Sequence, residues 1–335
     1  IEWLKNLTLT CSGTFNTLGK RRGFLRGFPR ALKLLLHSWI FTELPHFCLD
    51  RSSSEFRNEL RRCKTVIRHN VNWFVVGLAI RLAFMPFATH GDLIAQVWMT
   101  QFIAFFGKWN PYSFIEINYP TYVPIVVYPP VFMYFQAALL RLAGFILPDL
   151  TTFVKGIDPA LPSLGTPYYL YPHIHELLII LKFPYLIFDI STGIVLSLAL
   201  NNTNKSGLAF RFWMLNPIAI FTSFIFGQFD IVPTFFVALC VYFASRGKLM
   251  SAATSLGVGA TFKIFPLMLL PIIVLGPGRS GTQRARLLLA GIIPLVIASL
   301  PFIRTKAFVQ YVLFSEQSSR LLAATINVGH WDVFA

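Results

Sequence analysis

The sequence predicts an all-α, polytopic integral membrane protein. Hydrophobic residues make up 55% of the 335 residues and charged residues only 13%, whereas a soluble domain carries about 25% charged residues. The mean hydropathy is +0.61, and the apolar residues gather in stretches long enough to enter a bilayer. These observations exclude a disordered, collagen-like, coiled-coil or disulfide-stabilised protein.

The charge distribution favours a membrane partner over nucleic acid. The formal net charge is +15, from 29 Lys and Arg against 14 Asp and Glu. The basic residues lie beside apolar stretches, which is the pattern of the positive-inside rule. We therefore expect the lipid bilayer, and no nucleic acid, as a partner. The four cysteines have no metal-ligand spacing and predict neither a metal site nor a disulfide framework.

Two regions differ in composition. Residues 1–70 form a basic N-terminal segment to which we assign no function. Within it, the basic and leucine-rich residues from Lys20 to Leu36 are typical of an interfacial helix. Residues 71–335 contain the long apolar stretches and are expected to form the transmembrane domain.

The first predicted span is Val71–Ala88, and the basic residues before it place its N-terminal end in the cytoplasm. Residues 89–92 then lie on the outer face. Ile94–Phe106 is apolar but too short to span, so we expect a helix lying along the interface. A loop rich in Tyr, Asn and Pro follows over residues 107–128.

Further apolar stretches continue the pattern. They are Val131–Leu147, Leu177–Leu200, Leu208–Phe226, Ile231–Ala244 and Leu287–Ile303. Basic loops place residues 201–206 and 246–248 inside, and therefore residues 227–230 outside. The first two stretches would then both run inward, so one of them is expected to be re-entrant or a hairpin.

Lys263 lies in the middle of the apolar segment Met250–Gly276, which has basic residues on both sides. Each half has about 13 residues, too few to cross a core of about 30 Å. A broken hairpin with Lys263 and Pro266 at its turn is the simplest solution. Irregular backbone at membrane depth is tolerated where it lines a cavity or is buried in protein, which makes Lys263 a pointer to a site.

Asp92 is a candidate general base for a hydroxyl group, because it follows the first span directly. An Asp before an apolar run is also a favoured helix N-cap, and its position alone leaves both interpretations open. Lys182 and Asp189 lie seven residues apart on one helix face. For these two, a structural pair with each other is favoured over a functional role.

Three more ionisable residues lie at predicted span ends or breaks. Asp230 is either a site residue or the cap of the next helix. Lys263 is expected to neutralise a phosphate, with a snorkelling lysine as the alternative. Arg320 follows the last span on the outer side and has the geometry to bind phosphate bidentately, whereas a lone loop arginine is usually solvated. A nucleotide-binding glycine motif is absent from the sequence.

Taken in order, four motifs resemble the GT-C superfamily of membrane glycosyltransferases, which use polyprenyl-phosphate sugars as donors. The resemblance is nearest to the dolichyl-phosphate-glucose glucosyltransferases and to mannosyltransferases related to the second enzyme of GPI-anchor assembly. Gly227, at a place where the glucosyltransferases often carry His, favours the mannosyltransferase-like branch. The motifs are Gly91-Asp92 with Gln96 and Trp98, Tyr128-Pro129-Pro130 with Tyr134, Leu215-Asn216-Pro217 through Gly227-Gln228-Phe229-Asp230, and Gly257 through Lys263 and Pro266.

This resemblance implies a GT-C-like helical bundle with an outer-face loop after the first span and with further spans beyond residue 335. It implies that Asp92 is the catalytic base and that Lys263 and Arg320 bind the donor phosphate. The implied substrate-pocket residues are Gln96, Tyr128, Gln228 and Asp230. A phosphate leaves without protonation, so cations suffice to assist its departure and a second catalytic carboxylate is not needed.

The expected function is transfer of a hexose, mannose ahead of glucose, from a polyprenyl-phosphate sugar to a glycan or glycolipid acceptor on the outer or lumenal face. No cofactor is predicted, and the need for a divalent metal stays open. The expected location is the plasma membrane of a prokaryote or the endoplasmic reticulum membrane of a eukaryote. The alternative is a transporter or flippase that uses Lys182, Asp189 and Lys263 as buried pathway charges.

Overall fold

The computed structural model describes residues 53–156, 170–200, 205–314, 325–328 and 331–334. The chain divides into two compact units, Ile1–Leu60 and Arg61–Ala335. The predicted interfacial helix between Lys20 and Leu36 lies outside the described residues, as does Arg320. The fold described below is that of the second unit, which begins within α4 (Ser53–His69).

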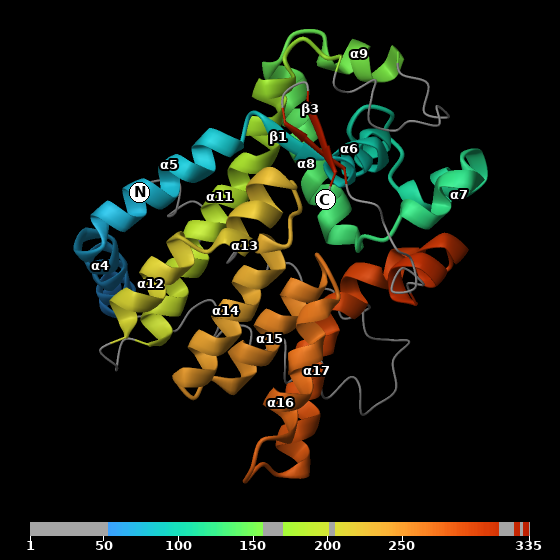
Figure 1. Cartoon of the computed structure of the whole chain (residues 1–335). Helices are drawn as coiled ribbons and strands as arrows, with labels where there is room; N and C mark the ends of the chain where they lie inside the picture. Colours follow the sequence, from blue (N-terminus) through green and yellow to red (C-terminus); the bar gives the residue numbers. More distant parts are fainter. Residues whose placement is uncertain (1–52, 157–169, 201–204, 315–324, 329–330, 335) are drawn as a thin grey trace. The chain divides into compact units, whose positions relative to one another are not determined.

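The second unit is built mainly of helices (Figure 1). The α-helices after α4 are α5 (Val71–Phe84), α6 (Gly91–Ala104), α7 (Pro111–Asn118), α8 (Pro130–Ile146), α9 (Leu150–Gly156), α11 (Ile174–Ala199), α12 (Ser206–Met214), α13 (Pro217–Ile220), α14 (Ile231–Ser245), α15 (Leu249–Ala260), α16 (Leu270–Leu275) and α17 (Gly281–Ser299). Short 3-10 or π turns are η2 (Pro120–Ile125), η3 (Phe221–Ile225), η4 (Phe265–Leu269), η5 (Leu300–Phe302) and η6 (Phe308–Leu313).

Apolar helices long enough to cross a membrane are present. Ile174–Ala199 and Gly281–Phe302 each meet this requirement by length and composition. The count among the described residues rises to four if each of two bent helix pairs forms one span. The fold is thus that of an α-helical membrane protein. The larger number of spans expected from the sequence stays a prediction.

The bend of 118° between α8 and α9 is where the sequence analysis left the topology open. Pro148 and Asp149 stand between the two helices, and Asp149 has a positive φ of 56°. Pro removes a backbone donor and a residue in the left-handed region ends a regular helix. This sharp bend fits the expectation that one of the two segments in this part of the chain does not run straight through the bilayer.

The predicted break around Lys263 is confirmed. Helix α15 ends at Ala260, the turn η4 follows, and α16 starts at Leu270. Helix α15 packs against α14 and α17. A Cβ on Gly257 would come within 2.3 Å of the Gly291 carbonyl oxygen of α17, so glycine is what permits this close helix crossing. The crossing fixes the direction in which the chain leaves α15 toward Lys263.

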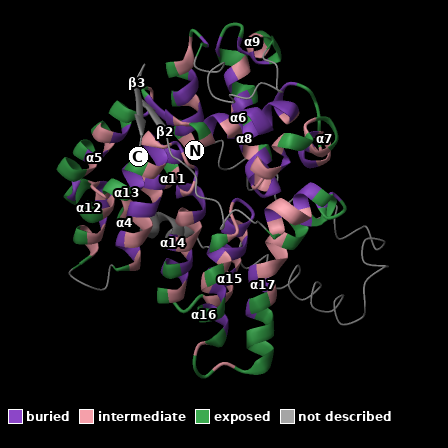
Figure 2. Cartoon of the chain, turned by 45° about the vertical axis from the view of Figure 1, so that its right-hand side comes forward, coloured by how far each residue is buried: buried purple, intermediate pink, exposed green. Residues whose placement is uncertain are grey.

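Helix α6 differs from the surface helix that the sequence predicted. It packs on α8, and its buried residues lie on all of its faces, including Leu93, Gln96 and Trp98 (Figure 2). A helix lying along a membrane surface would leave one polar face exposed. The alternation of Gln with apolar residues in this segment therefore reflects a buried helix with polar groups inside the protein.

Three short strands were not predicted. Strands β1 (Ala88–His90), β2 (Thr325–Val328) and β3 (Trp331–Phe334) form an antiparallel sheet in that order. The register pairs Ala88 with Val328 and His90 with Ile326. Because β1 directly precedes α6, the chain near its C-terminal end lies beside the segment that carries Asp92.

Candidate active site

Asp92 is the second residue of α6, and its side chain is about one-third exposed. His90 is the N-cap: its Nδ1 accepts a hydrogen bond of 3.1 Å from the Asp92 backbone N–H. The imidazole also stacks on Phe226 with ring centroids 3.8 Å apart. The Asp92 carboxylate is therefore not the helix cap, although it lies in the first turn of α6.

Gln228 donates a hydrogen bond to the Asp92 carboxylate. The chain reaches this position through Gly227, whose φ of +84° is open to glycine at little cost. A Cβ on Gly227 would stand 3.1 Å from the side chain of Leu93. The turn after η3 thus brings Gln228 onto α6 across 136 residues of sequence.

Asp230 and Lys263 form an ion pair with 2.5 Å between Oδ1 and Nζ, and both side chains are about one-third exposed. Asp230 stands at the start of α14, where its side chain makes no capping hydrogen bond. Lys263 lies in the break after α15, and its Nζ lies 5.7 Å from the centroid of the Phe229 ring. The broken helix therefore presents its ammonium group to Asp230, two residues beyond Gln228.

Tyr128 lies near both carboxylates. Gln96 Nε2 donates a hydrogen bond of 3.5 Å to its buried hydroxyl. Burial raises the pKa of the Tyr128 phenol well above its usual value, and the charges of Asp92 and Asp230 raise it further. The phenol is therefore a neutral hydrogen-bonding group at physiological pH.

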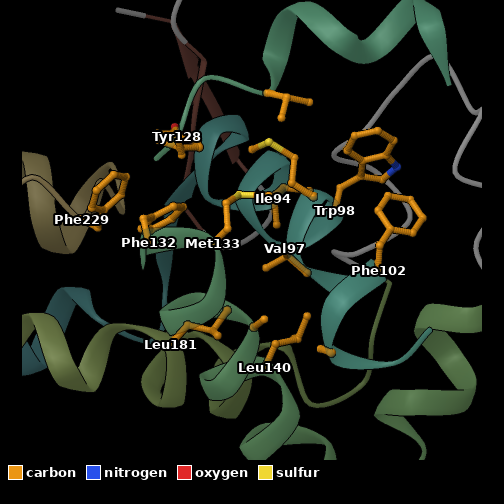
Figure 3. Close-up of a cluster of buried hydrophobic side chains, with 14 of the residues drawn as sticks. Ile94, Val97, Trp98, Phe102, Tyr128, Phe132, Met133, Leu140, Leu181 and Phe229 are labelled. Carbon is orange, nitrogen blue, oxygen red and sulfur yellow. The ribbon is translucent and has the colours of Figure 1, made fainter. Parts of the chain in front are cut away.

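Aromatic rings hold this tyrosine in place. Phe229 stacks on Phe132 with centroids 3.7 Å apart and meets Tyr128 edge-to-face at 5.1 Å. Figure 3 shows Tyr128, Phe132 and Phe229 close together on one side of the buried cluster. Pro129 and Pro130 set the extended entry into α8, which carries Phe132. The two prolines of the Tyr-Pro-Pro motif thus restrict the backbone that positions the Tyr128 phenol.

Six of the seven residues named from the sequence lie in one connected cluster. Gln228 contacts Asp92, Gln96 contacts Tyr128, and Asp230 pairs with Lys263. Phe229, between Gln228 and Asp230 in the chain, connects these groups because its ring contacts Tyr128 and lies 5.7 Å from Lys263 Nζ. Arg320, the seventh, lies outside the described residues. His90 was not singled out from the sequence. An N-cap of this type is a weak signal, because His is not among the favoured capping residues.

The expected pairing of Lys182 with Asp189 is wrong. Lys182 is fully buried and donates hydrogen bonds to the carbonyl oxygens of Met85, Ala88 and Phe224. Asp189 instead pairs with the buried Arg81. Two side chains seven residues apart can share a helix face and still contact different neighbouring helices. The spacing alone was therefore not enough to predict an ion pair between them.

Asp189 also accepts a hydrogen bond of 2.9 Å from the Trp213 indole N–H. Arg81 completes its contacts with the carbonyl oxygens of Gly77 and Met214. A buried ion pair survives when such hydrogen bonds satisfy its remaining groups. These charges join α5, α11 and α12 as a structural unit.

The cluster contains two carboxylates and one cation: Asp230 pairs with Lys263, whereas Asp92 accepts a hydrogen bond from the neutral Gln228 amide. Asp92 is accessible to take a proton from a hydroxyl group, and Lys263 is accessible to an anion that competes with Asp230. No group of three or more His, Cys, Asp or Glu side chains suited to a metal occurs within the described ranges.

Comparison with known proteins indicates which class of enzyme the chain resembles. Residues 185–330 match the model of glycosyltransferase family 87. This stretch contains Gln228, Asp230, Lys263 and Arg320, whereas Asp92 lies before it. A protein of Debaryomyces hansenii named GPI mannosyltransferase 1 is 32% identical over 111 residues, which is 30% of this chain and 27% of the relative. No solved structure gives a significant match.

The resemblance to GT-C membrane glycosyltransferases is thereby confirmed. The chain spans about a quarter of the length of the relative it matches. The family match includes Gln228, Asp230 and Lys263 of the cluster, whereas Asp92 and Tyr128 precede it. The hydrogen bond from Gln228 to Asp92 joins the two parts.

Proposed function

We propose that the protein is a membrane glycosyltransferase that moves a hexose, with mannose ahead of glucose, from a polyprenyl-phosphate donor to a hydroxyl of a glycan or glycolipid. The observation that carries the proposal is that Asp92, Gln228, Asp230 and Lys263 lie in one cluster, formed by the family match and the segment before it. A partly exposed carboxylate that is not neutralised by the cation, together with that cation, is what direct displacement of a phosphate requires.

In the proposed reaction, Asp92 takes the proton of the acceptor hydroxyl, and the oxygen attacks the anomeric carbon of the donor. The bond from that carbon to the phosphate oxygen breaks, and polyprenyl phosphate leaves as an anion. Lys263 stabilises the departing charge, with Arg320 as a second expected contact. Gln228 holds the carboxylate in place through its hydrogen bond and adds no charge of its own.

Asp230 has a specific role in this proposal. Its Oδ1 lies 2.5 Å from Lys263 Nζ. The donor phosphate must therefore replace or share this contact, since a lysine ammonium has three donors and can hold two acceptors. Asp230 keeps the lysine in position until the donor arrives.

Matched substitutions of Asp92 and Asp149 test the proposal. Asp92→Asn keeps the shape of the side chain and removes the base, so transfer from polyprenyl-phosphate mannose in detergent micelles should fall at least 100-fold. The thermal unfolding temperature should stay unchanged. Asp149→Asn is the control, because Asp149 is exposed between α8 and α9 and Asn tolerates its positive φ.

Retained transfer in the Asp92→Asn variant would remove Asp92 from the role of base. Comparison of mannose and glucose donors in the same assay decides the sugar. The proposed site faces the outer or lumenal side, in the endoplasmic reticulum membrane if the organism is eukaryotic and in the plasma membrane if it is prokaryotic.

The transporter alternative requires three buried pathway charges, and the structure engages two of them elsewhere. Lys182 is engaged with backbone carbonyls and Asp189 with Arg81. Both side chains are fully buried and joined to the framework. A translocation pathway needs ionisable groups that face a cavity, and these two do not supply them.

A further inference from the structure

A cavity with a basic lining lies at the other end of α5 from the segment that carries Asp92. Its volume is about 370 Å³, and it is formed where the end of α4 and the start of α5 meet the start of α12. The residues that line it are Arg61, Arg62, Thr65, Val66, His69, Asn70, Ser206 and Gly207. Two of these are arginines and none is acidic, so the cavity favours an anion.

Helix geometry gives the cavity its chemistry. Arg61, Thr65 and His69 follow one another at intervals of four residues and therefore share a face of α4. The Thr65 hydroxyl donates to the Arg61 carbonyl oxygen, and His69 Nδ1 lies 2.9 Å from the Thr65 carbonyl oxygen. This contact makes Nδ1 the protonated nitrogen and turns Nε2 away from the helix backbone.

The wall opposite α4 is the first turn of α12. Ser206 and Gly207 of this turn line the cavity. Asn70 also lines it: it is buried and accepts a hydrogen bond of 2.9 Å from Arg211 Nε. The cavity is thus formed between two helices, with both of its arginines on α4.

The cavity is distinct from the site around Asp92. Helix α5 runs from Val71, beside the cavity, to Phe84, close before β1 and Asp92. Its 14 residues correspond to a length of about 21 Å. The cavity is therefore at the end of α5 that the positive-inside rule assigns to the cytoplasm, at the depth where lipid headgroups lie.

From these observations we propose that this cavity binds a phosphate group, most readily the headgroup of an anionic lipid in the cytoplasmic leaflet. Arginine suits the forked geometry of phosphate oxygens. Basic pockets between membrane helices on the cytoplasmic side commonly hold such headgroups. The bound lipid joins α4, α5 and α12, and it stabilises the folded protein through the free energy of binding.

Binding of dioctanoyl phosphatidic acid to the full chain in micelles of a neutral detergent tests the proposal. The readout is the rise in thermal unfolding temperature with lipid concentration. The double variant Arg61→Ala/Arg62→Ala should bind on the order of tenfold more weakly. The variant Lys64→Ala/Arg68→Ala removes the same charge from another face of α4, outside the cavity, and should bind within twofold of the unmodified protein.

Dioctanoyl phosphatidylcholine and inorganic phosphate separate the possible sources of the phosphate. A larger stabilisation by phosphatidic acid than by inorganic phosphate supports a lipid headgroup, and equal stabilisation supports a soluble phosphate in the same cavity. Equal weakening in both double variants, or equal stabilisation by phosphatidylcholine, would overturn the proposal. If the arginine variant does not fold, Thr65→Glu places a carboxylate in the cavity and should abolish binding, whereas Thr65→Gln should retain it.

Discussion

At the residue scale, the candidate site separates its charges by neutral groups. Asp92 contacts an amide and an imidazole, while Asp230 takes the ammonium group of Lys263. An Asp92 paired directly with Lys263 would be a weaker base, because a nearby cation favours the charged carboxylate. Gln228 occupies the Asp92 carboxylate and Asp230 occupies the Lys263 ammonium group, so the base and the cation are not paired with each other.

The buried phenol of Tyr128 predicts a pH dependence of stability. Burial raises its pKa in the folded protein above the value of about 10 for an unfolded tyrosine. Above pH 10 the unfolded chain releases this proton and the folded chain keeps it, so stability is present below that pH and falls as the pH rises further. Thermal unfolding between pH 7 and pH 11 should show this loss. Tyr128→Phe should make it smaller, and an unchanged pH dependence in that variant would contradict the assignment.

At the element scale, the breaks in the helices position the site. Gln228 and Asp230 follow the π turn η3, and Lys263 precedes the 3-10 turn η4. Irregular backbone of this kind costs stability in a continuous helix, and here it turns polar side chains toward α6. The turn at Gly227 is the element that we expect to be most sensitive to a single substitution.

Gly227→Ala should lower both stability and activity. Alanine would pay about 1–2 kcal/mol for the positive φ and would also press its Cβ against Leu93. Gly247→Ala is the matched control: Gly247 has a φ of +71° with no heavy atom within 4 Å of the added Cβ. We expect a larger fall in unfolding temperature at position 227, together with lost transfer activity. Equal effects at both positions would exclude the contact with Leu93 as the cause.

Lys182 joins three elements and should be essential for folding rather than for chemistry. Its ammonium group satisfies carbonyl oxygens at the end of α5, in β1 and in η3. Lys182→Met would leave these buried acceptors without a donor, at a cost of about 3 kcal/mol or more. Thermal unfolding should show a clear loss of stability, whereas Lys248→Met, at an exposed residue before α15, should change little. A stable Lys182→Met variant that has lost transfer would instead point to a functional lysine.

At the scale of the whole molecule, the helices separate a polar site from basic loops. Helix α14 has 15 residues and begins at the residue after Asp230, while Arg246 and Lys248 follow its other end. At 1.5 Å per residue its length is about 22 Å. The site and the basic loop therefore lie at opposite ends of α14. The positive-inside rule predicts that the basic end is cytoplasmic and the site is on the other side of the bilayer.

Single-cysteine labelling in sealed vesicles tests this arrangement. In a background with all four native cysteines replaced by serine, Gly91→Cys should react with a membrane-impermeant maleimide from the outer or lumenal side alone. Lys248→Cys should react from the cytoplasmic side alone. Labelling of both positions from one side would refute the expected sidedness and with it the outer-face location of the proposed reaction.

The sequence by itself determined the class of fold and the residues of the candidate cluster. Composition demanded a membrane protein, and the order of motifs selected six residues that the structure brings together. The interruption of an apolar segment by Lys263 and Pro266 was enough to predict a break. These features can be predicted from the sequence because they depend on local patterns of hydropathy and on side-chain chemistry.

The tertiary structure alone decided which charges pair, where α6 is buried and that β1 meets β2. The contacts of Lys182 and Asp189 with partners 94 and 108 residues away depend on helix packing that sequence spacing does not encode. The same holds for the cavity between α4 and α12, whose lining comes from segments more than 130 residues apart. Long-range contacts of this kind depend on how whole helices pack against each other. The hydropathy pattern of one helix does not specify which helices it will contact.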